Sequence, residues 1–118
     1  MDENPSVAKR FRDALMPLGY DVEKDVYRGE NKVYFVFGYN TIPFQFSDDE
    51  AEYEKYLIWA RLKAPITVKI TELVMQAKRL IADAGFPFPQ SDPVGDENGQ
   101  EVLFETEWVE PIGADDDV

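Results

Sequence analysis

The stretch from residue 32 to residue 64 constrains the fold most, because strand-forming residues dominate it. Residues 33–39 are almost all β-branched or aromatic, residues 41–46 start a second such run, and residues 53–62 form a third. Asn40 and Thr41 separate the first two runs, and an acidic turn at residues 47–50 precedes the third. Neighbouring strands joined by short turns predict a β-meander, so we expect a sheet at the centre of this chain.

Two amphipathic helices are predicted to flank the meander. The first has Asn4 as its N-cap and Pro5 at its first position, and it ends before Pro17. The second covers about residues 65–85, and Gly85 followed by Pro87 ends it. Its apolar stripe consists of Ile66, Ile70, Leu73, Val74, Ala77, Leu80, Ile81 and Ala84. A stripe of this kind is buried against another element, and the sheet supplies that surface.

The remaining segments add strands, a loop and a tail. Residues 20–28 predict an edge strand, and Gly38 inside the first run of the meander predicts a bulge or a close backbone approach. Residues 86–100 predict a long loop that ends in a turn at Asn98 and Gly99. Residues 102–109 predict the last strand, and residues 111–118 a disordered acidic tail.

These elements predict one α+β domain over residues 1–110. Its sheet is mixed or mainly antiparallel and has about four to five strands, with the N-terminal helix and the long helix of about residues 65–85 packed on it. A length of 118 residues is typical of one domain.

Composition excludes several kinds of chemistry. The chain contains neither cysteine nor histidine, so it lacks thiolate chemistry, disulfides and the commonest metal ligand. No apolar run reaches the roughly 20 residues of a membrane span, and the N-terminus has no signal-peptide pattern, which predicts a cytoplasmic protein without membrane contact.

Charge is distributed very unevenly along the chain. The net charge is −12, of which residues 1–79 carry −1 and residues 80–118 carry −11, because every lysine and arginine lies in the first part. Nucleic-acid backbones are bound by clustered bases, so direct DNA or RNA binding is disfavoured. The asymmetry predicts one polarised surface or an acidic tail.

Candidate catalytic and metal sites are weak. Asp48, Asp49 and Glu50, followed by Glu52 and Glu54, could hold a hard cation, although a solvated turn explains them as well. Residues 92–99 resemble a calcium loop but have Val94 where that loop needs an acid. We therefore predict no enzymatic activity, no catalytic residue, no metal and no cofactor.

Several short segments together resemble a known protein family. They are residues 27–29, 33–37, 43–44, 46–50, 80–86 and the alternating aromatic and acidic residues 104–108. This series is similar to the small tail-completion or tail-terminator (head–tail joining) proteins of long-tailed bacteriophages. The resemblance extends over about residues 6–110, and the loop at 86–100 and the acidic tail depart from it.

The family resemblance implies both a function and partners. It implies an α+β fold and a ring, usually a hexamer, that caps the tail tube and joins it to the head. It therefore implies that copies of the chain, the major tail tube protein and a head connector or head-completion protein are the partners. The chain would then reside at the head–tail junction of a phage or prophage virion, after assembly in the host cytoplasm.

Interface residues can be proposed from charge and aromatic content. A ring needs two unlike patches, and we hypothesise that the basic face of the second helix in one subunit, with Lys78 and Arg79, meets acids of residues 92–110 on the next. The turn at residues 48–50 is expected to face the tube lumen or the tube protein. A ligand-binding aromatic patch is also conceivable, although packing in the core and sheet explains the same residues more simply: Tyr34, Phe35, Phe37, Tyr39, Phe44 and Phe46. The predicted interface residues are Phe44, Phe46, Asp48, Asp49, Glu50, Arg61, Lys63, Lys69, Lys78 and Arg79.

Three other functions stay open at this stage. The acidic last third is also typical of an inhibitor that mimics DNA and occupies a host nucleic-acid enzyme. A different connector or neck component of the virion would share the same general features. A small metal-dependent hydrolase rests only on the acids of residues 48–54.

Overall fold

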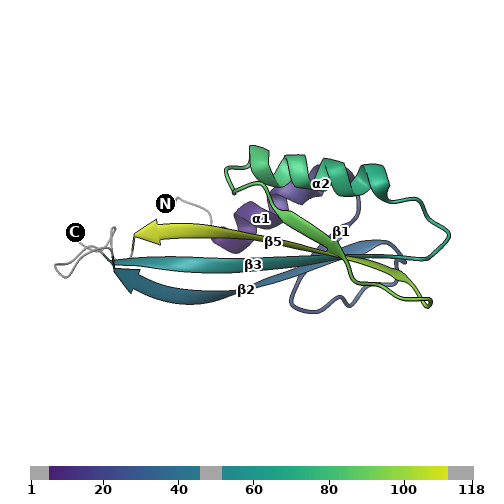
Figure 1. Cartoon of the computed structure of the whole chain (residues 1–118), viewed down its shortest axis with the longest axis horizontal. Helices are drawn as coiled ribbons and strands as arrows, with labels where there is room; N and C mark the ends of the chain where they lie inside the picture. The colour runs from purple at the N-terminus through teal and green to yellow at the C-terminus, as the bar shows by residue number, and fades with distance from the viewer. Residues whose placement is uncertain (1–5, 46–51, 112–118) are drawn as a thin grey trace.

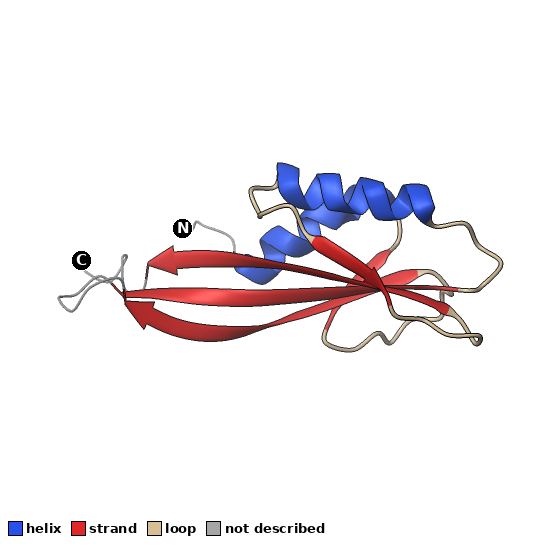
Figure 2. Ribbon diagram, viewed as in Figure 1, coloured by secondary structure: helices blue, strands red, loops and turns tan. Residues whose placement is uncertain are grey.

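The computed structural model describes residues 6–45 and 52–111, and of residues 44, 45 and 52 it describes only the backbone. It has an α+β fold, as predicted, with helices on one side of a long sheet (Figure 1, Figure 2). The elements are α1 (Val7–Leu15), a 3₁₀ turn η1 (Met16–Leu18), β1 (Asp21–Lys24), β2 (Tyr34–Gln45), β3 (Glu52–Ala64), α2 (Thr71–Asp83), β4 (Gln90–Pro93) and β5 (Gln100–Pro111).

The sheet has five strands in the order β1-β2-β3-β5-β4. The short edge strand β1 runs parallel to β2, and every other neighbouring pair is antiparallel, so the predicted mixed sheet is confirmed. β3 is the central strand and pairs without interruption on both sides, from Tyr34↔Lys63 to Gln45↔Glu52 with β2 and from Ala64↔Gln100 to Tyr53↔Pro111 with β5. The chain consequently has one stiff three-stranded centre.

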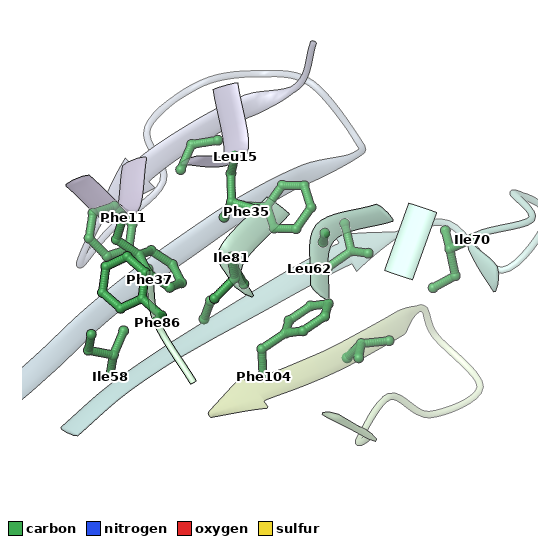
Figure 3. Packing of buried hydrophobic residues seen from close by; sticks show 14 of the residues in the cluster. Phe11, Leu15, Phe35, Phe37, Ile58, Leu62, Ile70, Ile81, Phe86 and Phe104 are labelled. Carbon is green, nitrogen blue, oxygen red and sulfur yellow. The ribbon is translucent and has the colours of Figure 1, made fainter. Parts of the chain in front are cut away.

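The hydrophobic core lies between the helices and one face of the sheet (Figure 3). Alternate residues of each strand point into it, because successive side chains of a strand point to opposite faces. Phe11 of α1 joins the layers: its ring centroid lies 5.1 Å from that of Phe37 and 5.4 Å from that of Phe86. The largest fully buried side chains are Phe11, Phe35, Phe37, Phe104, Leu15, Leu62 and Ile81.

Both helices begin later than predicted. Ser6 is the N-cap of α1, and its hydroxyl accepts a hydrogen bond from the Lys9 amide at 3.1 Å, so the start at Asn4 and Pro5 was wrong. α2 begins at Thr71 and not near residue 65. The amide of Gln100 donates to the carbonyls of Pro65 and Val68, both at 2.7 Å, and this contact from β5 holds the segment before α2 in a turn.

The predicted end of the second helix is confirmed. Gly85 has φ +105°, a conformation that glycine adopts readily. The Phe86 amide donates to the Ile81 carbonyl, and the Gly85 amide to the Ala82 carbonyl, which together form a Schellman motif. Ala77 and Ile81 of the stripe are buried, as a helix covering the sheet requires.

Three strand predictions need correction. Asn40 and Thr41 do not break the meander, because they pair with Leu57 and Tyr56 of β3 inside one continuous strand β2. The predicted loop at residues 86–100 contains β4, which is paired with β5. Strand β5 extends to Pro111, so the predicted tail begins after that residue, and residues 112–118 lie outside the described residues.

Candidate interaction surface

The long strands extend well beyond the helices that cover them (Figure 1). A strand of 12 or 13 residues spans about 40 Å, whereas a helix of 13 residues spans about 20 Å. The chain is accordingly elongated, with extents of 54 × 30 × 24 Å. We call the projecting part, residues 39–45, 52–57 and 106–111, the arm. Among the described residues, α1 and the segment after α2 contact the arm only at its base, through Arg10 and Phe86 on Trp108.

The helix-side face of the arm is aromatic near its base and acidic further out. The rings of Tyr39 and Tyr56 meet edge to face, with centroids 5.1 Å apart. Burial raises the pKa of the Tyr56 phenol, and the nearby carboxylates of Glu110 and Glu54 raise it further. An additional ligand or protein layer on this face would therefore meet aromatic rings with carboxylates beside them.

Trp108 marks the boundary between the arm and the helix layer. Its ring packs on Phe86 with the centroids 4.8 Å apart, and the Arg10 guanidinium lies 5.2 Å from its centroid. The indole Nε1 is buried and has no hydrogen-bond partner among the described residues. The base of the arm is thus anchored by a cation–π contact from α1 and an apolar contact from Phe86, which follows α2.

The face of the sheet opposite the helices carries no helix of the described chain, and the loop between β1 and β2 lies on part of it, where the Tyr27 ring stacks on Tyr34 (Figure 2). It carries ion pairs between β3 and β5: Arg61 with Glu101 at 2.9 Å, Lys63 with Glu101 at 3.5 Å, and Lys55 with Glu107 at 3.3 Å. Exposed apolar side chains lie between these pairs, and in the arm they are Ile42, Leu57 and Val109. A surface with both signs of charge and separate apolar side chains suits contact with another protein more than contact with a lipid.

The two outer edges of the arm have no strand partner in the part of the chain that the structure describes. β1 pairs with β2 only as far as Phe37, and β4 pairs with β5 only between Val102 and Glu105. Backbone N–H and C=O groups along the remaining edges are therefore available to another strand.

Two hydrogen bonds show which backbone groups point outward at these edges. The Phe37 carbonyl accepts from Asp25 on the β1 side, and the Glu101 carbonyl accepts from Val94 on the β4 side. The N–H and C=O groups of successive residues alternate between the two sides of a strand. In both β2 and β5 the backbone groups of the odd-numbered residues therefore point away from β3, toward the outer edge. In the arm they are Tyr39, Thr41 and Pro43 on β2, and Glu107, Val109 and Pro111 on β5.

The edges differ in charge and resemble each other at the tip. β2 contains no charged residue, whereas β5 contains four acids and no base. At the tip both edges present a proline, Pro43 or Pro111, which has no N–H to donate. The two outer edges of the arm are therefore chemically unlike, except for this common end.

The basic residues predicted as interface lie on two different surfaces. Arg61 and Lys63 are on the open face of the sheet, where they already pair with Glu101. Lys69 is exposed in the turn before α2, Arg79 is exposed on α2, and the Lys78 amine lies 5.7 Å from the Phe88 ring. The sheet separates these groups, so they form no single basic patch.

The aromatic and acidic residues predicted beside them are placed only in part. The backbone of Phe44 is in β2, opposite Tyr53 of β3. Phe46, Asp48, Asp49 and Glu50 lie outside the described residues. The arm itself was not predicted, although the sequence contains its signal: the strand-forming runs of residues 33–46 and 52–64 are longer than either helix can cover.

Features of an enzyme or metal site are sparse in the described chain. No group of three or more acidic side chains among those residues is arranged to hold a metal ion. A depression of about 580 Å³ lies at the end of the sheet opposite the arm, with Lys32, Lys63 and Glu101 in its wall. No described helix is long and apolar enough to cross a membrane.

Comparison with known proteins supports the fold and leaves the family open. No model of a known protein family matches the sequence, and no curated protein matches it. A solved structure whose printed name describes no function is similar to this chain, with a TM-score of 0.58 and 13% sequence identity. The similarity covers 87% of this chain and 88% of the other. At this identity the likeness concerns the fold alone.

Proposed function

We propose that this protein is a virion assembly protein of a long-tailed phage or prophage. It forms an oligomeric ring that caps the tail tube and joins it to the head connector. The observation that carries the proposal is the arm, whose outer edges have no strand partner among the described residues and whose faces are contacted there only at the base, around Thr106 and Trp108. A monomer gains little from extending three strands beyond its core, whereas a protein that joins other proteins gains a contact surface.

A ring is favoured over a simple dimer by the difference between the two edges. A two-fold dimer joins one patch to the same patch, whereas a cyclic ring joins two different patches. The uncharged edge of β2 and the acidic edge of β5 provide such a pair. The resemblance of residues 27–50 and 80–86 to tail-terminator proteins supports the same arrangement.

The acids between the arm strands suit a contact with the tail tube. Asp48, Asp49 and Glu50 belong to the segment that joins β2 to β3. In a ring whose arms point along the tube, negative charge there would repel passing DNA or dock on a basic site of the tube protein. Replacing Asp48 and Asp49 with alanine is expected to lower the yield of infectious particles, and unchanged yield would contradict this role.

Deletion of the coding region from its phage or prophage tests the function. Without a cap, tube polymerisation has no stop, so we expect tubes of uncontrolled length and heads without tails in negative-stain electron microscopy. Complementation with the wild-type chain should restore uniform, head-bound tails. Tails of normal length attached to heads in the deletion strain would overturn the proposal.

A DNA-mimicking inhibitor receives less support from the structure than from the composition. Such a protein presents unpaired carboxylates to an enzyme, but Glu101 and Glu107 on the open face are paired with bases of β3. If a pull-down from host lysate with this protein as bait recovered a DNA-binding enzyme and no tail protein, that result would favour the inhibitor function.

A further inference from the structure

We propose that copies of this chain join edge to edge, so that the outer edge of β2 in one copy pairs with the outer edge of β5 in the next. The paired residues are 39–43 of one copy and 107–111 of the other. This inference rests on the proposed ring and names its interface. It makes one continuous sheet from the arms of successive copies.

Strand direction allows the sheet to continue without turning a copy over. β2 and β5 are each antiparallel to β3, so they are parallel to each other. When the next copy is placed beside the first in the same orientation, its β5 therefore runs parallel to the first copy's β2. The helices of all copies then remain on one side of the common sheet, as a cyclic ring requires.

Backbone alternation satisfies the hydrogen bonds of that parallel pair. In a parallel pair, the N–H and C=O of one residue bond to two residues of the other strand. These two residues lie immediately before and after the residue directly opposite. Thr41 on the β2 edge would donate its N–H to one outward residue of β5 and accept from the next. The backbone groups of Glu107 and Val109 face outward, and β4 pairs with neither residue. The side chains of Thr41 and Glu110 then lie on the same, helix-side face.

Charge disfavours one of the alternative pairings. Two β5 edges in contact would bring the carboxylates of Glu107 and Glu110 of both copies together, and facing like charges destabilise a strand pair. The β2 edge has no such conflict, since the charges next to it, Lys24 and Asp25, pair with each other at 2.9 Å. Two β2 edges could meet, but each copy would then keep an unpaired β5 edge.

The two prolines set the extent of the pairing. Both β2 and β5 run toward the tip of the arm, so Pro43 and Pro111 lie at the same end of the new pair. Neither can donate a hydrogen bond, so the ladder stops at this level on both strands. Each interface between two copies is therefore short. In a closed ring every copy has two such interfaces, and both must break before a copy can leave the ring.

Proline substitution at each edge tests the interface. Thr41→Pro and Val109→Pro each remove one outward N–H, and neither N–H bonds within the described sheet. Thr41→Val and Val109→Thr keep the N–H and are the matched controls. Far-ultraviolet circular dichroism checks folding, and sedimentation velocity over a range of concentrations measures assembly. We expect rings for the wild type and both controls, and monomers for each proline variant alone.

Mixing the two proline variants gives the decisive result. The Thr41→Pro chain keeps its β5 edge and the Val109→Pro chain keeps its β2 edge, so an equimolar mixture should form one-to-one dimers that cannot grow. If Val109→Pro still associates by itself, the β2 edges pair with each other and the proposal is wrong. A wild type that stays monomeric at every concentration, or proline variants that form normal rings, also overturns it.

Cross-linking provides a measurement that does not depend on proline being tolerated. The chain has no cysteine, so Thr41→Cys and Glu110→Cys each introduce a single thiol. A short bis-maleimide should link a Thr41→Cys chain to a Glu110→Cys chain and yield few dimers of either variant alone. Dimers of Thr41→Cys alone would indicate paired β2 edges, and dimers of Glu110→Cys alone would indicate paired β5 edges; either result contradicts the proposal.

These tests separate the interface from the function. If deletion of the coding region produces uncapped tubes but both proline variants restore normal tails, the function holds and the edge pairing fails. If the deletion leaves tails normal while the proline variants complement each other as described, the pairing holds and the proposed function fails.

Discussion

The indole ring of Trp59 on β3 lies directly against Gly38 on the neighbouring strand β2. A Cβ built on Gly38 would stand 2.5 Å from the ring carbon Cζ2, which is too close for two carbon atoms. The register is uninterrupted at this position, with Gly38 opposite Trp59. Of the two alternatives that the sequence offered for Gly38, the close approach is therefore correct and the bulge is not.

Gly38→Ala should destabilise the protein by displacing the Trp59 ring. Inserting a methyl group into a filled site costs about 1–3 kcal/mol, and we expect the free energy of unfolding to fall by that amount in urea denaturation. In a Trp59→Leu background the added methyl group has more room, so Gly38→Ala should lower the free energy of unfolding by less. Equal losses in both backgrounds would show that the ring does not set the cost.

Gly85→Ala should weaken the end of α2 through backbone strain alone. The glycine has φ +105°, and a Cβ built on it would lie 3.6 Å from the Trp108 ring, so a methyl group has room there but the backbone conformation disfavours it. The expected loss is about 1–2 kcal/mol in thermal or urea unfolding. Gly99→Ala is the matched control, since Gly99 has no positive φ and a Cβ built on it would lie no closer than 3.6 Å to any atom beyond its chain neighbours, so its effect should be much smaller.

Phe11→Ala should remove the contact that joins α1 to the sheet and to Phe86. The side chain is 1% exposed, and truncation of a buried phenylalanine costs about 3–5 kcal/mol. That is a large part of the stability of a small domain, so the midpoint of urea denaturation should fall sharply. Phe88→Ala, at a ring that is 58% exposed, should change the midpoint little. Similar losses for both would contradict this core.

Asp21 should make stability depend on pH in the acid range. Hydrogen bonds from the Tyr27 hydroxyl at 2.6 Å and the Asn31 amide at 2.9 Å lower the pKa of its carboxyl below the ordinary value of 3.8. A lowered pKa in the folded state stabilises the protein above the unfolded pKa, and this contribution is lost as the pH falls through the folded pKa.

Two variants isolate the Asp21 contribution. Asp21→Asn should be less stable than the wild type at neutral pH, and the difference should shrink as the pH falls below 3.8. Tyr27→Phe removes the largest cause of the shift and should move the pKa of Asp21, measured by NMR titration, back toward its ordinary value. A constant stability difference between pH 7 and pH 2 would contradict this role for the carboxylate.

Reversing charge on α2 tests whether the helix contributes to assembly beside the arm. Lys78→Glu with Arg79→Glu should weaken the ring in light scattering if this part of one subunit meets acids of residues 92–110 on the next. Lys9→Glu, at an exposed site on α1, is the control for a general change in net charge. Undiminished rings in the α2 variant would confine the interface to the arm.

The sequence predicted best those elements whose pattern is local. The alternation of β5 places Phe104 in the core, while Glu105 points to the opposite face. The apolar stripe and Gly85 fix the existence and end of α2. These predictions hold because side-chain periodicity and glycine geometry act within a few residues of chain.

Predictions failed where a distant strand overrules local preference. Asn40 looked like a break, but pairing with Leu57 on β3 keeps the backbone extended. Residues 90–93 have polar side chains and a proline, yet they form β4 because the edge of β5 pairs with them. The start of α2 is delayed by Gln100, which is 29 residues away from Thr71 in the chain.

The candidate surface shows the same division. Sequence alone determined that the last third is acidic, that β2 is uncharged and that Pro43 and Pro111 cannot donate a hydrogen bond, since these are properties of the residues themselves. Only the tertiary structure decided that three strands continue past the helices and that both prolines point away from β3. The register of β3 with its two neighbours fixes these features, and register depends on contacts between residues far apart in the chain.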